Sequence, residues 1–325
     1  MNIDEINKKL KPLRDDVTRT MLVVAGIMLC VTIFLFAVAS TLGKGPFGRS
    51  MSSFTILSFI VWMFVLFVVA TFLIKPKIRT YKENVKTLVN KSMFESAFNH
   101  VVYDASRGFD RDAMRELGVM ETGNQYHSND FVRADYAGVT FERADVLSQN
   151  VTSTGKTTIT TTYFHGQVIK FDFHKETSGY VRIRDAGRFN RFSDGPKTER
   201  SRKIKFEDDR FNDQWATFTN DEQEAYRIFT PHFMEKINAF RTRLGHELSM
   251  VLKDGVVYLG IYSSRDAMEP NIFSDIDESY LQEIRLEIES IQYIIDTLTE
   301  NKDYFRGRDE HLRICDTCIG GSIHL

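Results

Sequence analysis

Cysteine is scarce in this sequence, and neither sign of charge predominates. Only three cysteines occur among 325 residues, and one of them, Cys30, lies inside a long apolar run. A disulfide framework is therefore excluded, which fits a reducing cytoplasm. The formal net charge is -2, from 42 Lys and Arg against 44 Asp and Glu. The whole chain therefore gives no reason to predict a nucleic-acid partner.

A complete catalytic motif is also missing. His246-Glu247 lacks the second histidine of a zincin helix, and no serine lies in a nucleophile-elbow context. A Gly-Lys-Thr sequence begins at Gly155, but a phosphate loop needs a glycine where Asn150 stands and a helix immediately afterwards. A threonine-rich stretch typical of a strand follows instead. We interpret this segment as a surface turn, and the sequence predicts no cofactor.

Two long uncharged runs are the strongest signal that is present. Residues 21–42 and 54–74 each hold about the 20 apolar residues that an α-helix needs to cross a hydrocarbon core of roughly 30 Å. The loop between them, residues 43–53, is rich in glycine and contains a proline, which suits a tight reversal. We therefore predict a transmembrane hairpin over residues 21–74.

Basic residues flank this hairpin on both outer sides and are rare in its connecting loop. By the positive-inside rule, we predict a multi-pass protein of the cell (inner) membrane with cytoplasmic N- and C-termini. A cleaved signal peptide is a poor alternative, because the first run is too long for an h-region and a second span follows. The flanking cations are Lys8, Lys9, Lys11, Arg14 and Arg19 before the first run, and Lys75, Lys77, Arg79, Lys82, Lys86 and Lys91 after the second.

Helical periodicity continues on both sides of the hairpin. Apolar residues at steps of three and four predict a cytoplasmic amphipathic helix over residues 1–20 and a juxtamembrane helix over residues 75–103. Because the hairpin returns the chain to the same face, the two helices could pack as an antiparallel stalk. Alternatively, each apolar stripe covers the soluble domain or lies on lipid headgroups.

Alternation at period two then predicts a sheet within residues 104–300. Residues 139–142 and 169–174 alternate between apolar and polar side chains. Two further alternating runs, residues 248–252 and 257–261, flank an Asp-Gly pair, which is a strong β-hairpin signal. We predict an α+β fold, in which a cytoplasmic antiparallel-sheet domain with flanking helices follows the transmembrane hairpin.

Capping residues predict the flanking helices. An aspartate and a glycine at the ends of residues 110–118 bound a short helix, and a Thr-Pro start and a closing glycine bound a second helix within residues 230–245. A long apolar stripe over residues 277–300 predicts a closing helix. The C-terminal tail, residues 301–325, has no sustained period.

Three segments of the sheet region resemble a known family. They read FVRADYAGVTFERADV (131–146), FHGQVIKFDF (164–173) and FEDDRFNDQWATFTNDEQEAYRIFTPHFMEKI (206–237). They are similar to the signature of the bacterial membrane-anchored domain of unknown function 3137, and the resemblance extends from about Leu10 to Leu298. Tyr226-Arg227 departs from it, because the family's order there is arginine-tyrosine.

This resemblance implies no activity, since the family has none established and no catalytic residue can be carried over. Genes of the family often lie beside those of LemA-type membrane proteins. The resemblance therefore implies a membrane-associated assembly role, with a LemA-type membrane protein as a protein partner.

A pair of cysteines near the C-terminus has the spacing of half a zinc site or of a redox pair. A four-ligand knuckle would use His311, Cys315, Cys318 and His324. A redox pair would normally stand at a helix N-terminus within a βαβ unit. Spacing alone does not decide between a metal site, a redox site and a tail with neither.

A basic loop lies between residues 187 and 205. On a tethered cytoplasmic domain it would lie near an anionic leaflet, where each cation adds about 1 kcal/mol of attraction at close range. Nucleic acid could use the same patch, and a solvated loop with an ordinary charge excess is the alternative. Its cations are Arg188, Arg191, Lys197, Arg200, Arg202, Lys203 and Lys205.

These observations support a non-enzymatic module that binds or scaffolds a partner at the cytoplasmic face of the membrane. Two alternatives stay open. One is an enzyme whose active site is assembled from scattered polar residues. The other is an anionic-lipid sensor that uses the basic loop.

Overall fold

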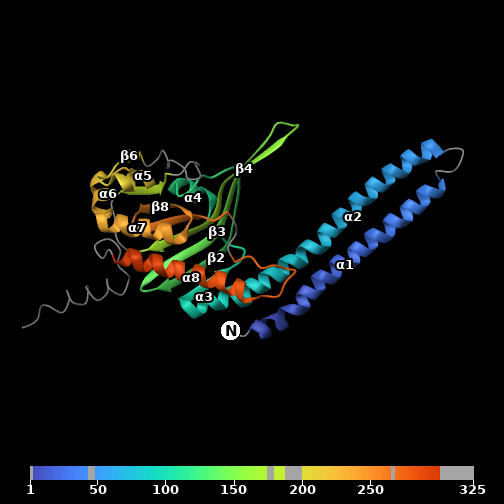
Figure 1. The fold of residues 1–325 in the computed structure, drawn as a ribbon, viewed down its shortest axis with the longest axis horizontal. Helices are drawn as coiled ribbons and strands as arrows, with labels where there is room; N and C mark the ends of the chain where they lie inside the picture. The colour runs from blue at the N-terminus through green and yellow to red at the C-terminus, as the bar shows by residue number, and fades with distance from the viewer. Residues whose placement is uncertain (1–2, 43–47, 174–178, 187–199, 265–267, 301–325) are drawn as a thin grey trace, which may run out of the picture. The chain divides into compact units, whose positions relative to one another are not determined.

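The computed structural model describes residues 3–42, 48–173, 179–186, 200–264 and 268–300. The chain forms two compact units, and Figure 1 shows their elements. The helical unit comprises residues 1–89 and 269–280. The sheet unit comprises residues 90–268 and 281–325.

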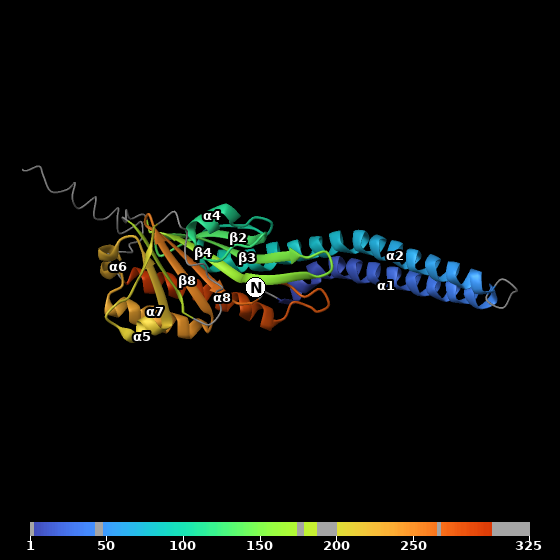
Figure 2. The ribbon, with the colours of Figure 1, turned by 90° about the horizontal axis from the view of Figure 1, so that it is seen from above.

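Two long helices dominate the helical unit, α1 (Ile3–Leu42) and α2 (Gly48–Val85). They lie side by side (Figure 2), and Lys77 joins them through its ammonium group, 2.7 Å from the Asp16 carboxylate and 2.9 Å from the Thr20 hydroxyl. Apolar side chains bury the seam, including Leu10 and Tyr81. Of the two arrangements open from the sequence, the antiparallel stalk is the one observed within this unit.

Residues 269–280 belong to the helical unit although they lie far along the chain. The Asn7 amide donates to the Ile276 carbonyl and accepts from the Ile276 N–H, both at 2.9 Å. Arg14 forms an ion pair with Asp275. Glu269 forms ion pairs with Lys82 and Lys86 of this unit. We call residues 269–276 the strap.

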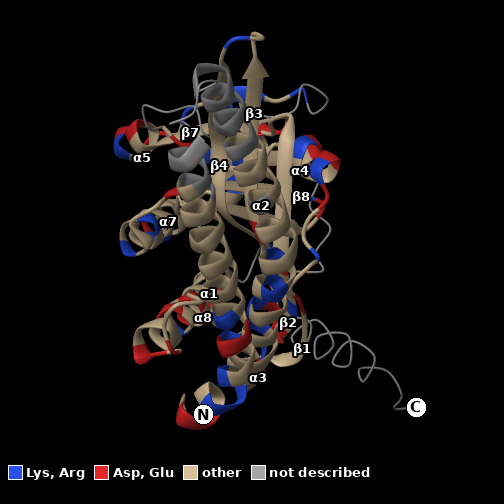
Figure 3. Cartoon of the chain, turned by 90° about the vertical axis from the view of Figure 1, so that its right-hand side faces the viewer, with Lys and Arg blue, Asp and Glu red and all other residues tan. Residues whose placement is uncertain are grey.

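The distal parts of both helices expose large apolar side chains. Leu22 is 68% exposed, Phe34 66%, Phe64 67% and Phe72 76%. Both helices are long and apolar enough to cross a membrane. Figure 3 shows Lys, Arg, Asp and Glu gathered away from these apolar stretches.

After α2 the chain passes through a π-helical turn, η1 (Lys86–Asn90), and α3 (Lys91–Ala97) to strand β1 (Asn99–Asp104). The prediction that the helix continues to residue 103 is therefore wrong. Phe98 already has extended backbone angles, φ -131° and ψ 159°. The Val-Val-Tyr run that follows favours a strand, and it pairs with the next strand of the sheet.

One antiparallel sheet of nine strands is found in the described part of the chain, in the order β1-β2-β3-β4-β9-β8-β5-β7-β6. The predicted α+β fold with an antiparallel sheet is confirmed. The remaining strands are β2 (Gln125–Tyr136), β3 (Val139–Ser153), β4 (Thr158–Asp172), β5 (Tyr180–Asp185), β6 (Arg202–Ile204), β7 (Trp215–Thr219), β8 (Glu247–Lys253) and β9 (Val256–Tyr262).

Turn chemistry explains the β8–β9 hairpin. Asp254 and Gly255 have φ values of 51° and 74°, the left-handed conformation that a two-residue hairpin loop requires and that glycine adopts freely. Lys253 pairs with Val256 directly across this turn. The hairpin predicted from alternation and the Asp-Gly pair is confirmed.

Helices cover both faces of the sheet (Figure 2). On one face lies α4 (Arg111–Leu117), and on the other lie α7 (Pro231–Leu244) and α8 (Glu278–Thr299). Two short helices, α5 (Asp209–Gln214) and α6 (Glu222–Ile228), precede α7. The buried apolar cluster on the α4 face comprises Met114, Val119, Met120, Val146, Phe164, Val168, Tyr180 and Val251.

The predicted caps are confirmed. The Asp110 carboxylate accepts from the backbone N–H groups of residues 112 and 113, and Gly118 ends α4 at a φ of 69°. The Thr230 hydroxyl accepts from the N–H of residue 233, and Gly245 ends α7 at a φ of 67°. A side-chain oxygen at the start and a left-handed glycine at the end satisfy groups that a helix leaves open.

Strands β3 and β4 extend past their neighbours as a two-stranded arm, residues 150–162 (Figure 1). The pairing of β2 with β3 ends at Gln149, and the pairing of β9 with β4 begins at Gly166. In the described chain, residues 150–153 therefore pair only with residues 158–161. The Asn124 side chain continues the β2 edge for one more residue, because it bonds the N–H and the carbonyl of Val151 at 2.8 and 2.7 Å.

Candidate functional site

A cluster of charged side chains is buried between the sheet and α8. Arg143 of β3 has no solvent exposure, and its guanidinium donates to Asp145 at 2.8 Å and to Glu287 of α8 at 2.9 Å. Gln167 of β4 donates to the second oxygen of Glu287, also at 2.9 Å. Asp145 is fully buried, and Glu287 is 9% exposed. The cluster thus joins two strands to α8.

A second layer of hydrogen bonds extends this cluster toward β1. Asp130 is fully buried, and its carboxylate accepts from the Tyr103 hydroxyl and from the Asn129 amide, each at 2.7 Å. Burial, together with the Asp130 charge, raises the pKa of the Tyr103 phenol. Tyr103 therefore stays protonated and acts as a donor.

The balance of charges keeps Arg143 ionised. Burial by itself lowers the pKa of Arg143, but attraction to Asp145, Glu287 and Asp130 outweighs burial and raises it. Desolvation of such a group is costly, so the cluster is stable only while its partners stay in place. The guanidinium of Arg143 thus depends on the charges of three carboxylates, those of Asp145, Glu287 and Asp130.

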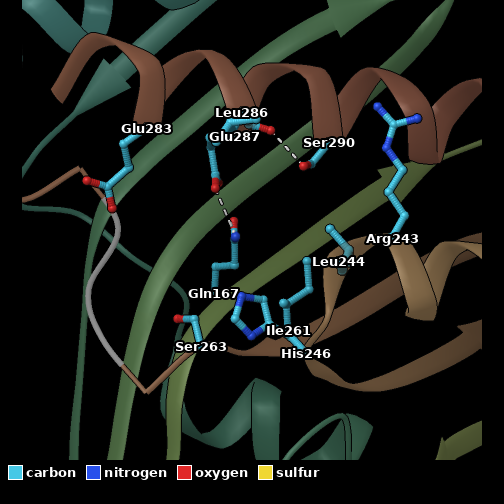
Figure 4. Close-up of a pocket in the computed structure, with 10 residues that line it drawn as sticks. All are labelled: Gln167, Arg243, Leu244, His246, Ile261, Ser263, Glu283, Leu286, Glu287 and Ser290. Carbon is cyan, nitrogen blue, oxygen red and sulfur yellow. Dashed lines mark hydrogen bonds between the residues drawn. The ribbon is translucent and has the colours of Figure 1, made fainter. Parts of the chain in front are cut away.

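A pocket of about 240 Å³ opens beside this cluster. Gln167 and Glu287 form part of its lining and are also members of the buried cluster. Figure 4 shows α8 along one side and the β8 and β9 region along the other. The lining residues are Gln167, Arg243, Leu244, His246, Ile261, Ser263, Glu283, Leu286, Glu287 and Ser290.

The pocket presents both acidic and basic groups. Glu283 and Glu287 are one helical turn apart on α8, so their carboxylates face the same region. Arg243 packs over the Tyr293 ring, with its guanidinium carbon 4.3 Å from the ring centre. His246 is exposed. The arrangement can bind a polar ligand, and an imidazole and a carboxylate are also the groups that acid–base chemistry uses.

The longest segment that resembles the family has a structural role. Asp208, Asp221 and Thr230 cap α5, α6 and α7 through side-chain oxygens. The Asn212 side chain bonds both the N–H and the carbonyl of Phe206, at 2.9 and 2.8 Å. Asp208 accepts from the backbone N–H groups of residues 210 and 211 as the N-cap of α5. Aromatic rings pack between the short helices, namely Phe206, Phe211, Trp215, Tyr226, Phe229 and Phe233.

Tyr226 and Arg227, where the sequence departs from the family's order, contact neighbouring residues of the sheet unit. The Tyr226 ring meets Phe206 edge-on at 5.5 Å, and its hydroxyl donates to the Lys205 carbonyl at 3.1 Å. Arg227 lies 3.8 Å from Glu224 on the helix surface. Neither residue lines the pocket.

The predicted basic loop lies only partly within the described residues. Arg202 and Lys203 belong to β6, and Arg202 pairs with Glu222 at 3.0 Å. Arg200 and Lys205 flank this strand. Arg188, Arg191 and Lys197 lie outside the described residues. Binding of an anionic surface by this loop stays a prediction.

The predicted zinc knuckle, His311, Cys315, Cys318 and His324, lies wholly outside the described residues. Within the part of the chain that the structure describes, no group of three or more His, Cys, Asp or Glu side chains could hold a metal ion. The Gly-Lys-Thr segment is described, and it forms the tip of the arm. Gly155 has a φ of 79°, and the surface turn predicted there is confirmed.

Sequence reasoning missed the buried cluster and the pocket. One signal for the cluster was available, because the alternation that puts Phe141 on the buried face also puts Arg143 and Asp145 there. Charged side chains on the apolar face of a strand indicate a buried ion pair. No comparable signal exists for the pocket, whose lining comes from segments far apart in the chain.

Residues 162–300 match a family model described as "Protein of unknown function (DUF3137)". This segment of the chain is therefore similar to the DUF3137 family. The match includes the whole of the second and third segments that carry the resemblance, residues 164–173 and 206–237. The first segment, residues 131–146, and the two long helices lie outside it. The family description assigns no activity to the DUF3137 domain.

No curated protein matches the chain. A solved structure that matches is the crystal structure of the mycobacterial trehalose monomycolate transport factor A, TtfA, with 11% identity over 64% of this chain and 93% of that chain. The TM-score is 0.35.

Proposed function

We propose that this protein is a membrane-anchored module that binds or scaffolds a protein partner at the cytoplasmic face of the bacterial cell membrane. The anchor consists of the two long helices, whose exposed apolar side chains need an apolar surrounding. Side chains such as Phe64 and Phe72 are exposed by 67% and 76%. A continuous apolar surface of this length is unfavourable in water and marks a site of contact with a membrane or another protein. A hydrocarbon core would cover them.

The orientation rests on charge. Cations at the N-terminal flank and after the second apolar run outnumber those of the connecting loop, which supports cytoplasmic termini under the positive-inside rule. Lys77 and Arg14, which pair within the helical unit, stand among these cations. The sheet unit would then lie in the cytoplasm.

The observation that carries the partner-binding function is the arm. In the described chain, residues 150–153 and 158–161 pair only with one another. The Asn124 side chain bonds Val151 on the β3 edge, so the β4 edge, residues 158–161, is the one that offers backbone N–H and carbonyl groups. Such edges accept an added strand from another protein. Ile159 on this arm is 58% exposed and supplies an apolar contact.

A LemA-type membrane protein is the partner that we propose to test first, because the family resemblance implies it. A point variant tests the arm. Ile159→Lys is expected to reduce capture of the partner by the detergent-solubilised chain, since the charge repels an added strand and removes the apolar contact. Val102→Lys on β1 is the matched control, because Val102 is also about half exposed, at 53%.

We expect the full-length chain to recover more partner than a chain truncated after residue 103, which measures the background. Recovery should fall in Ile159→Lys and stay unchanged in Val102→Lys. Recovery that is equal in the two variants would reject the arm as the surface. Absence of any reproducible partner above that background would reject the partner-binding function.

A second candidate function is favoured by the pocket. His246, Ser263 and Glu283 around a cavity of about 240 Å³ provide the residue types of an acid–base or nucleophilic site. Such an enzyme would turn over ester, amide or phosphoester probes, and His246→Ala would abolish turnover. His232→Ala, at an exposed histidine of α7 outside the pocket, should leave it unchanged. Loss in both variants, or in neither, would reject this candidate.

A further inference from the structure

The pocket beside α8 has opposite charges at its two ends. Figure 4 shows Glu283 at one end of the lining and Arg243 at the other, with Glu287 between them. The face of the Arg243 guanidinium contacts Tyr293, which leaves the N–H groups at its edge available to a ligand. Among the residues that the structure describes, no carboxylate forms an ion pair with Arg243.

We propose that this pocket binds a small linear zwitterion. The ammonium group would lie at Glu283 and Glu287, and the carboxylate group would receive hydrogen bonds from Arg243. This function goes beyond partner binding by the arm and does not depend on it.

The buried cluster favours a cation at the acidic end. Arg143 is the guanidinium that Asp145 and Glu287 share, and Asp130 adds a third carboxylate nearby. Glu287 is the member of this cluster that lines the pocket. Each carboxylate oxygen can accept more than one hydrogen bond, so Glu287 can bind an ammonium group without losing Arg143 or Gln167.

The dimensions select the length of the ligand. An α-helix rises about 1.5 Å per residue, so Glu287 and Tyr293 are about 9 Å apart along α8, and Arg243 of α7 packs against the Tyr293 ring. A volume of about 240 Å³ holds about eight water molecules at roughly 30 Å³ each. An ω-amino acid or a dipeptide has this length and size. Leu244, Ile261 and Leu286 in the lining provide apolar contacts for its middle.

Three probes of matched length test the proposal. Titration calorimetry of the full-length chain in detergent would compare 6-aminohexanoate, hexylamine and hexanoate. Because the zwitterion makes contacts at both ends, we expect it to bind at least about tenfold more tightly than either singly charged probe. Equal affinity for hexylamine, or no saturable binding up to about 10 mM, would overturn the proposal.

Variants at the two ends of the pocket test the ammonium contact and the carboxylate contact separately. Glu283→Gln is expected to weaken 6-aminohexanoate about tenfold, whereas Glu289→Gln, on the exposed side of the same helix, should leave it unchanged. Arg243→Gln should reduce the affinity for 6-aminohexanoate to that for hexylamine, with Arg285→Gln as its control. An equal loss in variant and control would contradict the assigned contacts.

The arm variant keeps this test apart from the test of partner binding. Ile159→Lys should lose the protein partner and retain 6-aminohexanoate. Glu283→Gln should retain the protein partner and bind 6-aminohexanoate more weakly. Zwitterion binding that is lost in Ile159→Lys would overturn the assignment of the ligand to the pocket.

Discussion

The two long helices and the sheet reverse the usual distribution of side chains in opposite ways. On α2, Phe64 is 67% exposed, whereas on β3 both Arg143 and Asp145 are fully buried. In a soluble domain, large apolar groups are normally inside and charged groups outside. The helices are thus long and apolar enough to cross a membrane, and the sheet requires pairing of its interior charges.

The comparison shows that exposure alone does not define a functional surface. An exposed phenylalanine on α2 is part of a continuous apolar helix, whereas an exposed Phe273, at 76%, stands in the short strap. A buried arginine is stable only because its neighbours carry the opposite charge.

The largest effect is expected at Arg143. Arg143→Met leaves Asp145 and Glu287 buried without their shared cation, so the free energy of unfolding should fall by about 3–5 kcal/mol. Thermal or urea unfolding of the detergent-solubilised chain would measure this. Arg133→Met is the control, because the Arg133 side chain is 58% exposed and lies 4.0 Å from Glu142.

A second variant distinguishes lost pairing from lost packing. Adding Asp145→Asn and Glu287→Gln to Arg143→Met removes the uncompensated charges and should recover part of the stability. A loss of less than about 1 kcal/mol in Arg143→Met, equal to that of the control, would show that the buried charges do not depend on one another.

The next effect concerns the helices. Phe64→Arg places a charge near the centre of the second apolar run, where insertion costs about 2.5–3.5 kcal/mol. The membrane-bound fraction of the protein should therefore fall. Phe273→Arg, at a position outside the apolar runs that is also largely exposed (76%), should leave that fraction unchanged. An equal response of the two variants would argue against a membrane-spanning α2.

A smaller effect is expected from the cap of α5. The Asp208 carboxylate accepts from the N–H groups of Arg210 and Phe211 at 2.9 and 3.2 Å. Asp208→Ala should therefore cost about 1 kcal/mol of stability. Asp209→Ala, one residue later and without a capping bond, should cost only a few tenths of a kcal/mol, and the reverse order would contradict the cap.

The smallest effect is the response of the strap to acid. Burial raises the pKa of Glu269, but hydrogen bonds and attraction from Lys82 and Lys86 outweigh burial and lower it. A lowered pKa means that these contacts stabilise the strap at neutral pH and are lost as the pH falls below about 4. Hydrogen exchange of residues 269–276 should then rise by at most about fivefold, since partly exposed pairs contribute about 0–1 kcal/mol.

Glu269→Gln removes the titrating group, so strap exchange in this variant should not depend on pH once intrinsic rates are corrected. Glu83→Gln is the control, because Glu83 pairs with Arg79 on α2. An unchanged pH response in Glu269→Gln would assign the acid sensitivity to another group.

Much of the fold follows from local sequence. Period-two alternation located β3 and β4, the Asp-Gly pair located the β8–β9 turn, and Thr230-Pro231 located the start of α7. These signals are local because a turn or a cap is made by residues adjacent in sequence. The β1 strand was missed because the helical pattern of residues 75–98 obscured the change at Phe98.

The candidate site could not be found in the same way. Glu287 reaches Arg143 across 144 positions of sequence, and only the packing of α8 on the sheet brings them together. Alternation could place Arg143 on the buried face but could not name its partner. The pocket depends further on the ends of α7 and β9, whose positions follow from the sheet order.

Membrane attachment and orientation are tested most directly by one fractionation. The full-length chain with a reporter fused after Leu325 is extracted with alkaline carbonate, and the compartment of the reporter is determined in intact cells. The account predicts that the chain stays in the membrane pellet and that the reporter is cytoplasmic. Release by carbonate, or a reporter outside the cytoplasm, would contradict it.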